Sequence, residues 1–107
     1  MQRKAEDFQC PMDFAVSIVC GRYKALILWH LGQGTLRYSQ LQRKIPKATP
    51  KVLTSQLRDL EQDGLIVRTV YPTVPPKVEY SLTSWGKRLI PVLDSLCDWG
   101  KEYMQRK

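Results

Sequence analysis

Hydrogen-bond donors recur along one short stretch of the sequence, residues 47–62. At about 3.6 residues per helical turn, several of these donors share one side of a helix. They are Lys51, Ser55, Arg58 and Gln62, with Thr54 at the edge. None of these side chains is acidic, and all of them are types that bind phosphates or the edges of bases. The spacing therefore favours recognition of a polyanion, with nucleic acid as the leading candidate.

The positive charge of the chain is concentrated in one interval. The net charge is +7, from 17 lysines and arginines against 10 acids, and no carboxylate occurs between Asp13 and Asp59. That interval contains Arg22, Lys24, Arg37, Arg43, Lys44, Lys47, Lys51 and Arg58. Charges of one sign repel each other and destabilise a compact chain unless a polyanion compensates them. A basic surface that is simply hydrated is the alternative interpretation of the charge alone.

Patterns for catalysis and metal binding are missing from the sequence. It has one histidine and three cysteines without metal-ligand spacing, and it has no phosphate-binding loop and no paired nucleophile and base. The chain is therefore expected not to be an enzyme and to need no metal or cofactor. Glu61, Asp63 and Glu79 are interpreted as surface or capping charges, and His30 as a satisfied core or interface histidine.

The composition indicates one ordinary globular domain over residues 1–107. Hydrophobic residues make up 43% of the chain and charged residues 25%, as in soluble proteins of this size. The longest apolar run, ALILW, is far shorter than the roughly 18 residues that a membrane span requires. Acids stand near the N-terminus where a signal peptide needs an apolar stretch. We therefore expect a cytoplasmic protein without a membrane partner.

The helix that carries the donors has clear start and end signals. Thr49 is a suitable N-cap and Pro50 suits the first helical position. An apolar stripe at i, i+4 and i+7 then faces a core; it consists of Leu53, Leu57 and Leu60. Gly64 follows at the position where a left-handed residue commonly ends a helix. The donors lie opposite the leucines, so they are expected to point outward.

Three further helices are predicted before this one. The first covers residues 12–20, with Pro11 at its first position. The second covers residues 23–32 and, being mostly apolar, is expected to be buried on most sides. The third covers residues 38–45. No internal repeat or low-complexity linker separates them, so these helices are expected to pack together.

A hairpin and a long helix are predicted after Gly64. The sequence alternates over residues 65–72 and again over 77–82, with a double proline between, which predicts two strands and a stiff loop. The last helix starts near Thr83 or Ser84 and continues to the C-terminus, and Pro91 is expected to kink it or to mark an irregular start. Its apolar face is too wide to serve only the chain's own small core.

Three small helices, a hairpin and a long helix are the order of a winged helix-turn-helix, an α+β fold that is mostly α. Here the second, third and fourth predicted helices, the hairpin and the last helix follow that order. In that fold the helix before the hairpin enters the DNA major groove, and the hairpin, or wing, reaches along the backbone or into the minor groove. Arg68 and Lys77 flank the wing and Lys47 precedes the helix, so these three are expected to touch phosphate. The predicted DNA-binding residues are Lys47, Thr49, Lys51, Thr54, Ser55, Arg58, Gln62, Arg68 and Lys77.

Three segments together resemble the HxlR family of bacterial and archaeal transcription regulators: CPMDFAVSIVCGRYKALILWHL, LRYSQLQRKIP and KVLTSQLRDLEQDGLIVRTVYPTVPPKVEYSLTSWGKRLIPVLDSLCDWG. The resemblance implies a homodimeric repressor or activator, with repression the first choice, that binds an inverted repeat near a promoter. It implies a DNA-binding core at about 22–82 and dimerisation helices at about 11–20 and 84–104. The dimer contact is then expected to include Leu89, Leu93, Leu96, Cys97, Trp99, Gly100 and Tyr103.

Cys10 precedes Pro11 and is predicted to lie at the N-cap of the first helix. The partial positive charge of a helix N-terminus favours a thiolate and so raises reactivity. Several regulators that resemble this chain sense oxidants or electrophiles with a cysteine at this place, which makes Cys10 a candidate sensor. The alternative is that Cys10 only caps the helix and packs at the dimer contact. Cys20 and Cys97 are interpreted as inert small hydrophobes.

A second class of function remains open at this stage. Winged-helix domains also serve as protein–protein interaction modules, although the basic face with Lys51 and Arg58 argues against that use here. The three tryptophans, Trp29, Trp85 and Trp99, are expected to pack in the core and at the dimer contact. A small-molecule pocket between the three tryptophans, for an effector of unknown identity, is the alternative interpretation.

Overall fold

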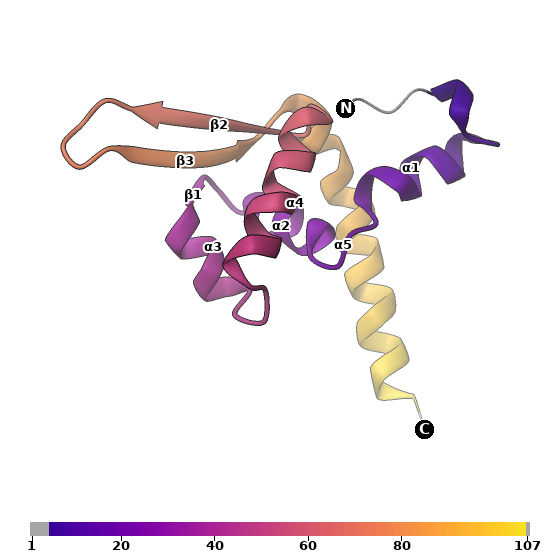
Figure 1. The fold of residues 1–107 in the computed structure, drawn as a ribbon. Helices are drawn as coiled ribbons and strands as arrows, with labels where there is room; N and C mark the ends of the chain where they lie inside the picture. The colour runs from indigo at the N-terminus through magenta and orange to yellow at the C-terminus, as the bar shows by residue number, and fades with distance from the viewer. Residues whose placement is uncertain (1–4, 107) are drawn as a thin grey trace.

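The computed structural model describes residues 5–106, in which helices pack beside a small antiparallel sheet (Figure 1). The elements in chain order are the 3-10 helix Ala5–Asp7, α1 (Pro11–Val19), α2 (Lys24–Leu31), β1 (Leu36–Arg37), α3 (Tyr38–Lys44), α4 (Pro50–Gln62), β2 (Ile66–Tyr71), β3 (Lys77–Leu82) and α5 (Ser84–Gln105). This order confirms the predicted α+β, mostly α, winged helix-turn-helix. The hairpin of β2 and β3 is the wing, and it projects beyond α4 above α3 (Figure 1).

The core lies where α2, α3, α4 and the sheet meet. The predicted stripe on α4 is confirmed, since Leu53 and Leu60 are fully buried and Leu57 is 2% exposed. These leucines belong to one buried cluster with Ile27 of α2 and Leu41 of α3. Burying one such side chain contributes about 1.5–3 kcal/mol. The stripe therefore fixes α4 on the body and turns its opposite side to solvent.

Both ends of α4 are capped as the sequence predicts. The Thr49 hydroxyl accepts a hydrogen bond from the backbone N–H of Val52 at 3.2 Å. Gly64 has a φ of +78°, the left-handed conformation that glycine adopts without strain. Thr83 caps α5 by accepting from the N–H of Gly86, and its own hydroxyl donates to the Gly64 carbonyl at 2.6 Å. The end of α4 is thereby tied to the start of α5.

The sheet has the strand order β1-β3-β2, and both pairs are antiparallel. In the wing, the register runs from Ile66 opposite Leu82 to Tyr71 opposite Lys77, which confirms the predicted hairpin. The strand β1 has two residues and pairs with the middle of β3. It was not predicted, because a strand this short carries no alternation and is defined only by its distant partner.

The two N-terminal helices differ in how far they are covered. The helix predicted over 23–32 is α2, and the prediction that it is buried on most sides is confirmed, since only Leu26 among its residues is exposed. The helix predicted over 12–20 is α1, and none of its residues is buried. No single helix of the described residues is long and apolar enough to cross a membrane; α1 and α2 meet that criterion only as a pair bent by 81°.

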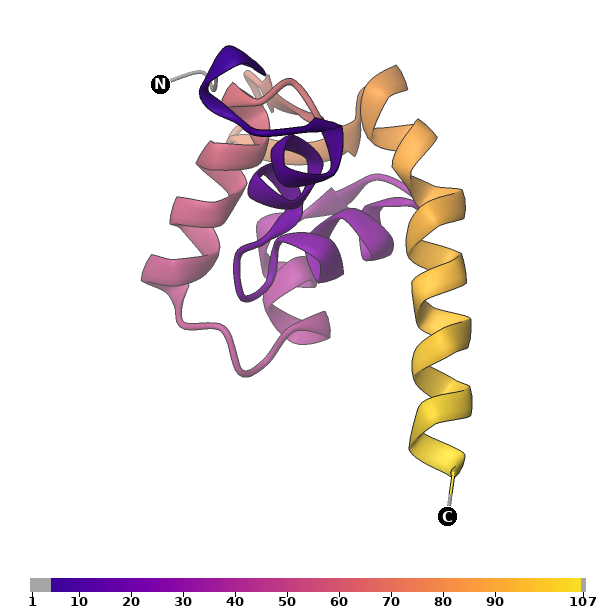
Figure 2. The same cartoon turned by 90° about the vertical axis from the view of Figure 1, so that its right-hand side faces the viewer.

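The last helix is continuous from Ser84 to Gln105 and has Pro91 inside it. The predicted irregular start at Pro91 is therefore wrong. Proline removes one backbone hydrogen bond, to the carbonyl four residues earlier. Both Pro91 and Lys87 are exposed, so water can bind the carbonyl that loses its partner. The C-terminal half of α5 runs past the rest of the molecule (Figure 2).

Candidate nucleic-acid interface

The outward side of α4 is available to a ligand. All five donors that the sequence places there are exposed: Lys51, Thr54, Ser55, Arg58 and Gln62. Thr49 is exposed as well, and although its hydroxyl oxygen accepts the cap bond, its proton remains free to donate. Because the buried leucines fix the helix from behind, these donors have a defined direction. The geometry is that of a rigid helix whose polar surface is rich in donors and includes one exposed acid, Glu61.

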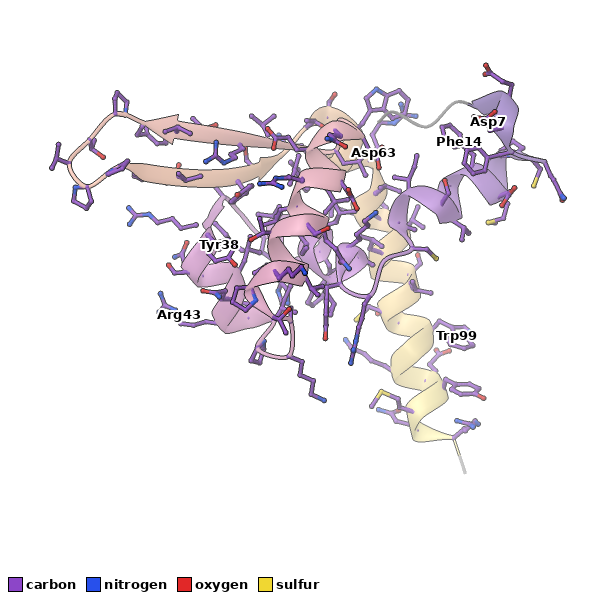
Figure 3. The ribbon with its side chains drawn as sticks, viewed as in Figure 1. Asp7, Phe14, Tyr38, Arg43, Asp63 and Trp99 are labelled. Carbon is purple, nitrogen blue, oxygen red and sulfur yellow. The ribbon has the colours of Figure 1, made fainter. Side chains whose placement is uncertain are left out.

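Tyr38 connects α3 to the first turn of α4, a connection that the sequence did not indicate. Its hydroxyl donates to the Pro50 carbonyl at 3.2 Å and accepts from the Thr54 hydroxyl at 3.4 Å. Figure 3 labels Tyr38 beside α4, with Arg43 farther along α3. Since Thr54 is a predicted DNA-binding residue, Tyr38 positions part of the interface. The only signal for it in the sequence is a tyrosine at the start of the preceding helix.

The loop before α4 is held from the other side by Tyr23. The Tyr23 hydroxyl donates to the Lys47 carbonyl at 3.2 Å, and its backbone N–H donates to the Gln56 side chain at 2.8 Å. The Lys47 side chain is exposed. Its backbone is thus fixed, while its ammonium group can reach a ligand next to the N-terminus of α4.

Lys24 does not contribute to the surface charge as the sequence suggested. It is 4% exposed, and its Nζ lies 3.3 Å from Oδ2 of Asp59 on α4. A buried lysine requires such a partner because an unpaired charge in the interior is costly. Lys24 is therefore a structural contact between α2 and α4, and the basic surface has one charge fewer than the sequence indicated.

The two basic residues of the wing have different surroundings. Arg68 of β2 is exposed. Lys77 forms an ion pair with Glu79 at 3.2 Å, and its Nζ lies 5.0 Å from the centre of the Tyr71 ring. The charge of Lys77 is therefore partly neutralised within the wing, whereas the charge of Arg68 is available to bind a ligand.

A polar hollow separates α4 from the base of the wing. It has a volume of about 400 Å³. Its lining residues are Thr54, Leu57, Arg58, Glu61, Arg68 and Tyr80. Two predicted DNA-binding arginines, Arg58 and Arg68, thus meet at one place. Glu61, which was interpreted as a plain surface charge, shares this hollow with them.

The cysteines are all free. Cys10 is the N-cap of α1, as predicted, but its side chain makes no capping hydrogen bond, and its thiol group is exposed. Cys20 is exposed too, because the chain turns at Gly21 and leaves it uncovered. The interpretation of Cys20 as an inert residue stays a prediction. Cys97 is half-buried.

His30 differs from the satisfied histidine that the sequence predicted. Its Nδ1 is buried and has no hydrogen-bond partner within residues 5–106. Burial lowers the pKa of His30, and the positive charge of Lys44 lowers that pKa further. Both effects disfavour the imidazolium, because a buried ring loses hydration and a nearby cation repels a second positive charge.

The predicted dimer surface on α5 consists of two parts. Leu89 packs against the core and Leu93 is 7% exposed, so both lie in the chain's own interior. Toward the C-terminus, Leu96 is 59%, Trp99 60% and Tyr103 48% exposed. The last two rings are stacked, with centroids 4.9 Å apart, and Figure 3 shows Trp99 on the outer side of the helix. Cys97 and Gly100, which also belong to the predicted dimer contact, are half-buried.

An apolar hollow of about 250 Å³ lies next to this surface, between α2 and α5. It is lined by Ala25, Leu26, Trp29, Leu93, Leu96 and Cys97. The sequence predicted that the three tryptophans pack in the core and at the dimer contact. Trp29 packs against the core and is half-buried. Trp85 is 62% exposed, with the Arg88 guanidinium 4.3 Å from the centre of its ring.

Comparisons with known proteins agree with this geometry. Residues 18–107 match the family model of the HxlR-like helix-turn-helix proteins. An uncharacterized HTH-type transcriptional regulator of Methanothermobacter thermautotrophicus is 51% identical over 98 residues, which cover 92% of this chain and 75% of that protein. No cluster of three or more metal-ligating side chains occurs in the part of the chain that the structure describes.

Solved structures of the redox regulator HypR are similar to this chain in both of its forms. The oxidized form has a TM-score of 0.85 and 40% sequence identity, and the match covers 92% of this chain and 99% of that one. The reduced form has a TM-score of 0.86 and 38% identity, and the match covers 90% and 95%. Helices, wing and long C-terminal helix therefore have the same arrangement in a protein with a described regulatory role.

Proposed function

The chain belongs to the HxlR-like helix-turn-helix family of transcriptional regulators, and from that premise we propose that it binds an inverted-repeat operator in double-stranded DNA as a homodimer. The observation that carries the proposal is the outward side of α4, where exposed donors face solvent and the one exposed acid of the helix, Glu61, lies at their edge. In this proposal the dimer represses transcription by occupying a site near a promoter.

The proposed contacts follow from where the side chains lie. Lys51 and Arg58 bind phosphates or guanine edges, and Thr54, Ser55 and Gln62 bind bases or backbone. Arg68 binds phosphate from the wing. Lys47, Thr49 and Lys77 complete the contacts at the edges, with Lys77 weaker because Glu79 already neutralises it.

The dimer is proposed to form through α1 and the C-terminal half of α5. These helices expose Met12 (71%), Leu96 (59%) and Trp99 (60%), and apolar surface of this kind is usually covered by a partner. Two-fold symmetry would place the two α4 helices about 34 Å apart, one turn of DNA, or a multiple of that distance.

The test is selection of bound duplexes from a random pool, followed by titration of the selected duplex at several salt concentrations. An inverted repeat should emerge, and the logarithm of affinity should fall by about 0.9 per logarithm of salt for each neutralised phosphate. Arg58→Ala should bind the selected duplex about 10- to 100-fold more weakly while remaining folded. No enrichment and no binding at low salt would favour the protein–protein interaction module instead.

We further propose that Cys10 makes the regulator responsive to oxidants or electrophiles. Its exposed thiol lies at the start of α1, a helix that the proposed dimer uses, and the similar protein HypR is a redox regulator. Diamide should change operator affinity of the wild type and of Cys20→Ser, an exposed-cysteine control, but not of Cys10→Ser. Equal responses of wild type and Cys10→Ser would show that Cys10 is not the switch.

A further inference from the structure

The carboxylates of α4 and the wing are not equivalent. Asp59 pairs with Lys24, and Glu79 pairs with Lys77. Asp63 also has an interaction partner. The side-chain carboxylate of Glu61 has no ion pair or hydrogen bond within the described residues 5–106, although the Glu61 backbone carbonyl accepts from the N–H of Gly64. Glu61 is therefore the acid of this region whose charge is not already compensated.

Glu61 lies on the side of α4 that faces the wing. Thr54, Arg58 and Glu61 are spaced at i, i+4 and i+7, so they form one stripe along the helix. This stripe borders the hollow of about 400 Å³ whose opposite wall includes Arg68 of β2. The floor is formed by Leu57 and Tyr80, which are both buried, so the walls stand on a fixed base.

The side chains of the two arginines that border the hollow are also without partners. The guanidinium groups of Arg58 and Arg68 make no ion pair or hydrogen bond to another residue of the described chain. Both residues are exposed and line the same hollow, so their guanidinium groups can bind one tetrahedral anion together. Arginine binds phosphate oxygens with two parallel hydrogen bonds, so it suits this role better than lysine.

We infer that the hollow is a binding site for one backbone phosphate of DNA, held by Arg58 and Arg68, and that Glu61 weakens this site by repelling the phosphate. The inference rests on the proposed function, because it identifies which group of the duplex these residues bind. It assigns Arg58 to the backbone rather than to a base edge. It also gives Glu61 a defined effect, a lower affinity for any duplex irrespective of sequence.

The size of the effect follows from the positions of the charges. Glu61 and a phosphate in the same hollow are neighbours that water partly screens, which corresponds to a change of roughly threefold in affinity. The C-terminal half of α5 runs past the rest of the molecule (Figure 2). Exposed charges separated by more than a Debye length, about 10 Å in 0.1 M salt, are largely screened, so a carboxylate on that half should have no effect. Glu102 is an exposed residue of that half.

The first experiment compares Glu61→Gln with Glu102→Gln, which changes the net charge by the same amount. Affinity is measured for the duplex selected from the random pool and for a shuffled duplex of equal composition. Glu61→Gln should bind both duplexes roughly threefold more tightly, and Glu102→Gln should bind both as the wild type does. Sedimentation of each variant confirms that its oligomeric state is unchanged.

The second experiment places Glu61→Gln in a chain that also carries Arg58→Ala and Arg68→Ala. Without the two arginines no phosphate is held in the hollow, so the gain from Glu61→Gln should disappear. Arg68→Ala alone should lower the salt slope of binding by about 0.9, the contribution of one phosphate.

Three results would overturn the inference while the proposed function stands: Glu61→Gln binds as the wild type does, it binds more weakly, or its gain persists without the arginines. The last result would mean that only net charge matters. Failure of the wild type to bind either duplex would instead refute the proposed function, and it would be seen before any variant is tested.

Discussion

Two helices of this protein present exposed surfaces of opposite chemistry. On α4 the outward side is polar and rich in donors, with Glu61 as its one exposed acid. The helix is backed by Leu53, Leu57 and Leu60, which are at most 2% exposed. On α5 the C-terminal half is apolar, with Trp99 60% exposed and the helix running past the body (Figure 2). The helix that carries the first surface packs on the core of its own chain, whereas the helix segment that carries the second surface extends beyond that core.

This difference separates two needs of the molecule. The donors on α4 can form hydrogen bonds with water when no polyanion is bound. This surface therefore requires only that the helix beneath it is rigid. An apolar surface costs about 25 cal/mol for each Å² left in water, so α5 would gain stability from the proposed partner. We therefore expect changes behind α4 to affect folding, changes on α4 to affect ligand binding, and changes on α5 to affect association.

The largest effect is expected behind α4. Leu57→Ala removes a buried side chain from the stripe that fixes this helix, and it should lower the free energy of unfolding by about 2–5 kcal/mol. Chemical denaturation with the midpoint read by circular dichroism measures the change. A loss below 1 kcal/mol would mean that α4 is not held by this stripe.

The next effect should appear in association rather than in folding. Leu96→Asp puts a charge into the exposed apolar surface of α5, which should weaken the proposed dimer by 2 kcal/mol or more, about 30-fold. Sedimentation equilibrium measures it, and Leu96→Met serves as the matched control. A dimer that tolerates Leu96→Asp would show that this part of α5 is not the contact.

Two lysines test whether the basic surface is as the structure describes it. Lys51 is exposed on α4, whereas Lys24 is buried against Asp59. Lys51→Met should reduce the salt slope of DNA binding by about one. Lys24→Met should leave that slope unchanged and act only on stability. Equal slopes for the two variants would contradict the assignment of Lys24 to the interior.

A smaller effect is expected at the junction of α3 and α4. Tyr38→Phe keeps the ring and removes the hydroxyl that bonds to Pro50 and Thr54. A hydrogen bond of this kind contributes about 0.5–1.5 kcal/mol, and operator affinity should fall by a similar amount because Thr54 loses its position. Binding equal to that of the wild type would remove Tyr38 from the support of the interface.

The smallest effect concerns pH. The pKa of His30 is lowered in the folded protein relative to its ordinary value of 6.5, so the unfolded chain binds the proton more readily. Above pH 6.5 the ring is neutral in both states, so His30 does not reduce stability there. As pH falls below 6.5 the unfolded chain takes up the proton first, and the free energy of unfolding declines. Denaturation at pH 7.5 and 5.5 should show a loss in the wild type and a smaller one in His30→Gln. An equal loss in both proteins would exclude His30 as the cause.

The features predicted correctly from the sequence depend on neighbours along the chain. The leucine stripe, the Thr49 cap, the Gly64 turn and the hairpin each follow from spacings within a few turns or strands. The contacts that were missed join distant residues. Lys24 finds Asp59 on another helix, and β1 exists only because β3 lies beside it, so neither leaves a local pattern.

The candidate site also has features that follow from neighbours along the chain and features that depend on distant residues. Which side chains point outward from α4 could be derived from helical period alone, but the meeting of Arg58 with Arg68 required the packing of the wing on α4. The exposed state of Trp85 and Cys20 was also beyond the sequence, because an apolar residue carries no sign of whether a neighbour will cover it.

Titration of duplex DNA at increasing salt, with wild type and Arg58→Ala side by side, probes the central claim most directly. A wild type that binds tightly in dilute buffer and loses affinity steeply with salt, together with a variant at least tenfold weaker, is the expected outcome. Identical curves for the two proteins, or no binding by either, would contradict the role of α4 as the helix that meets DNA.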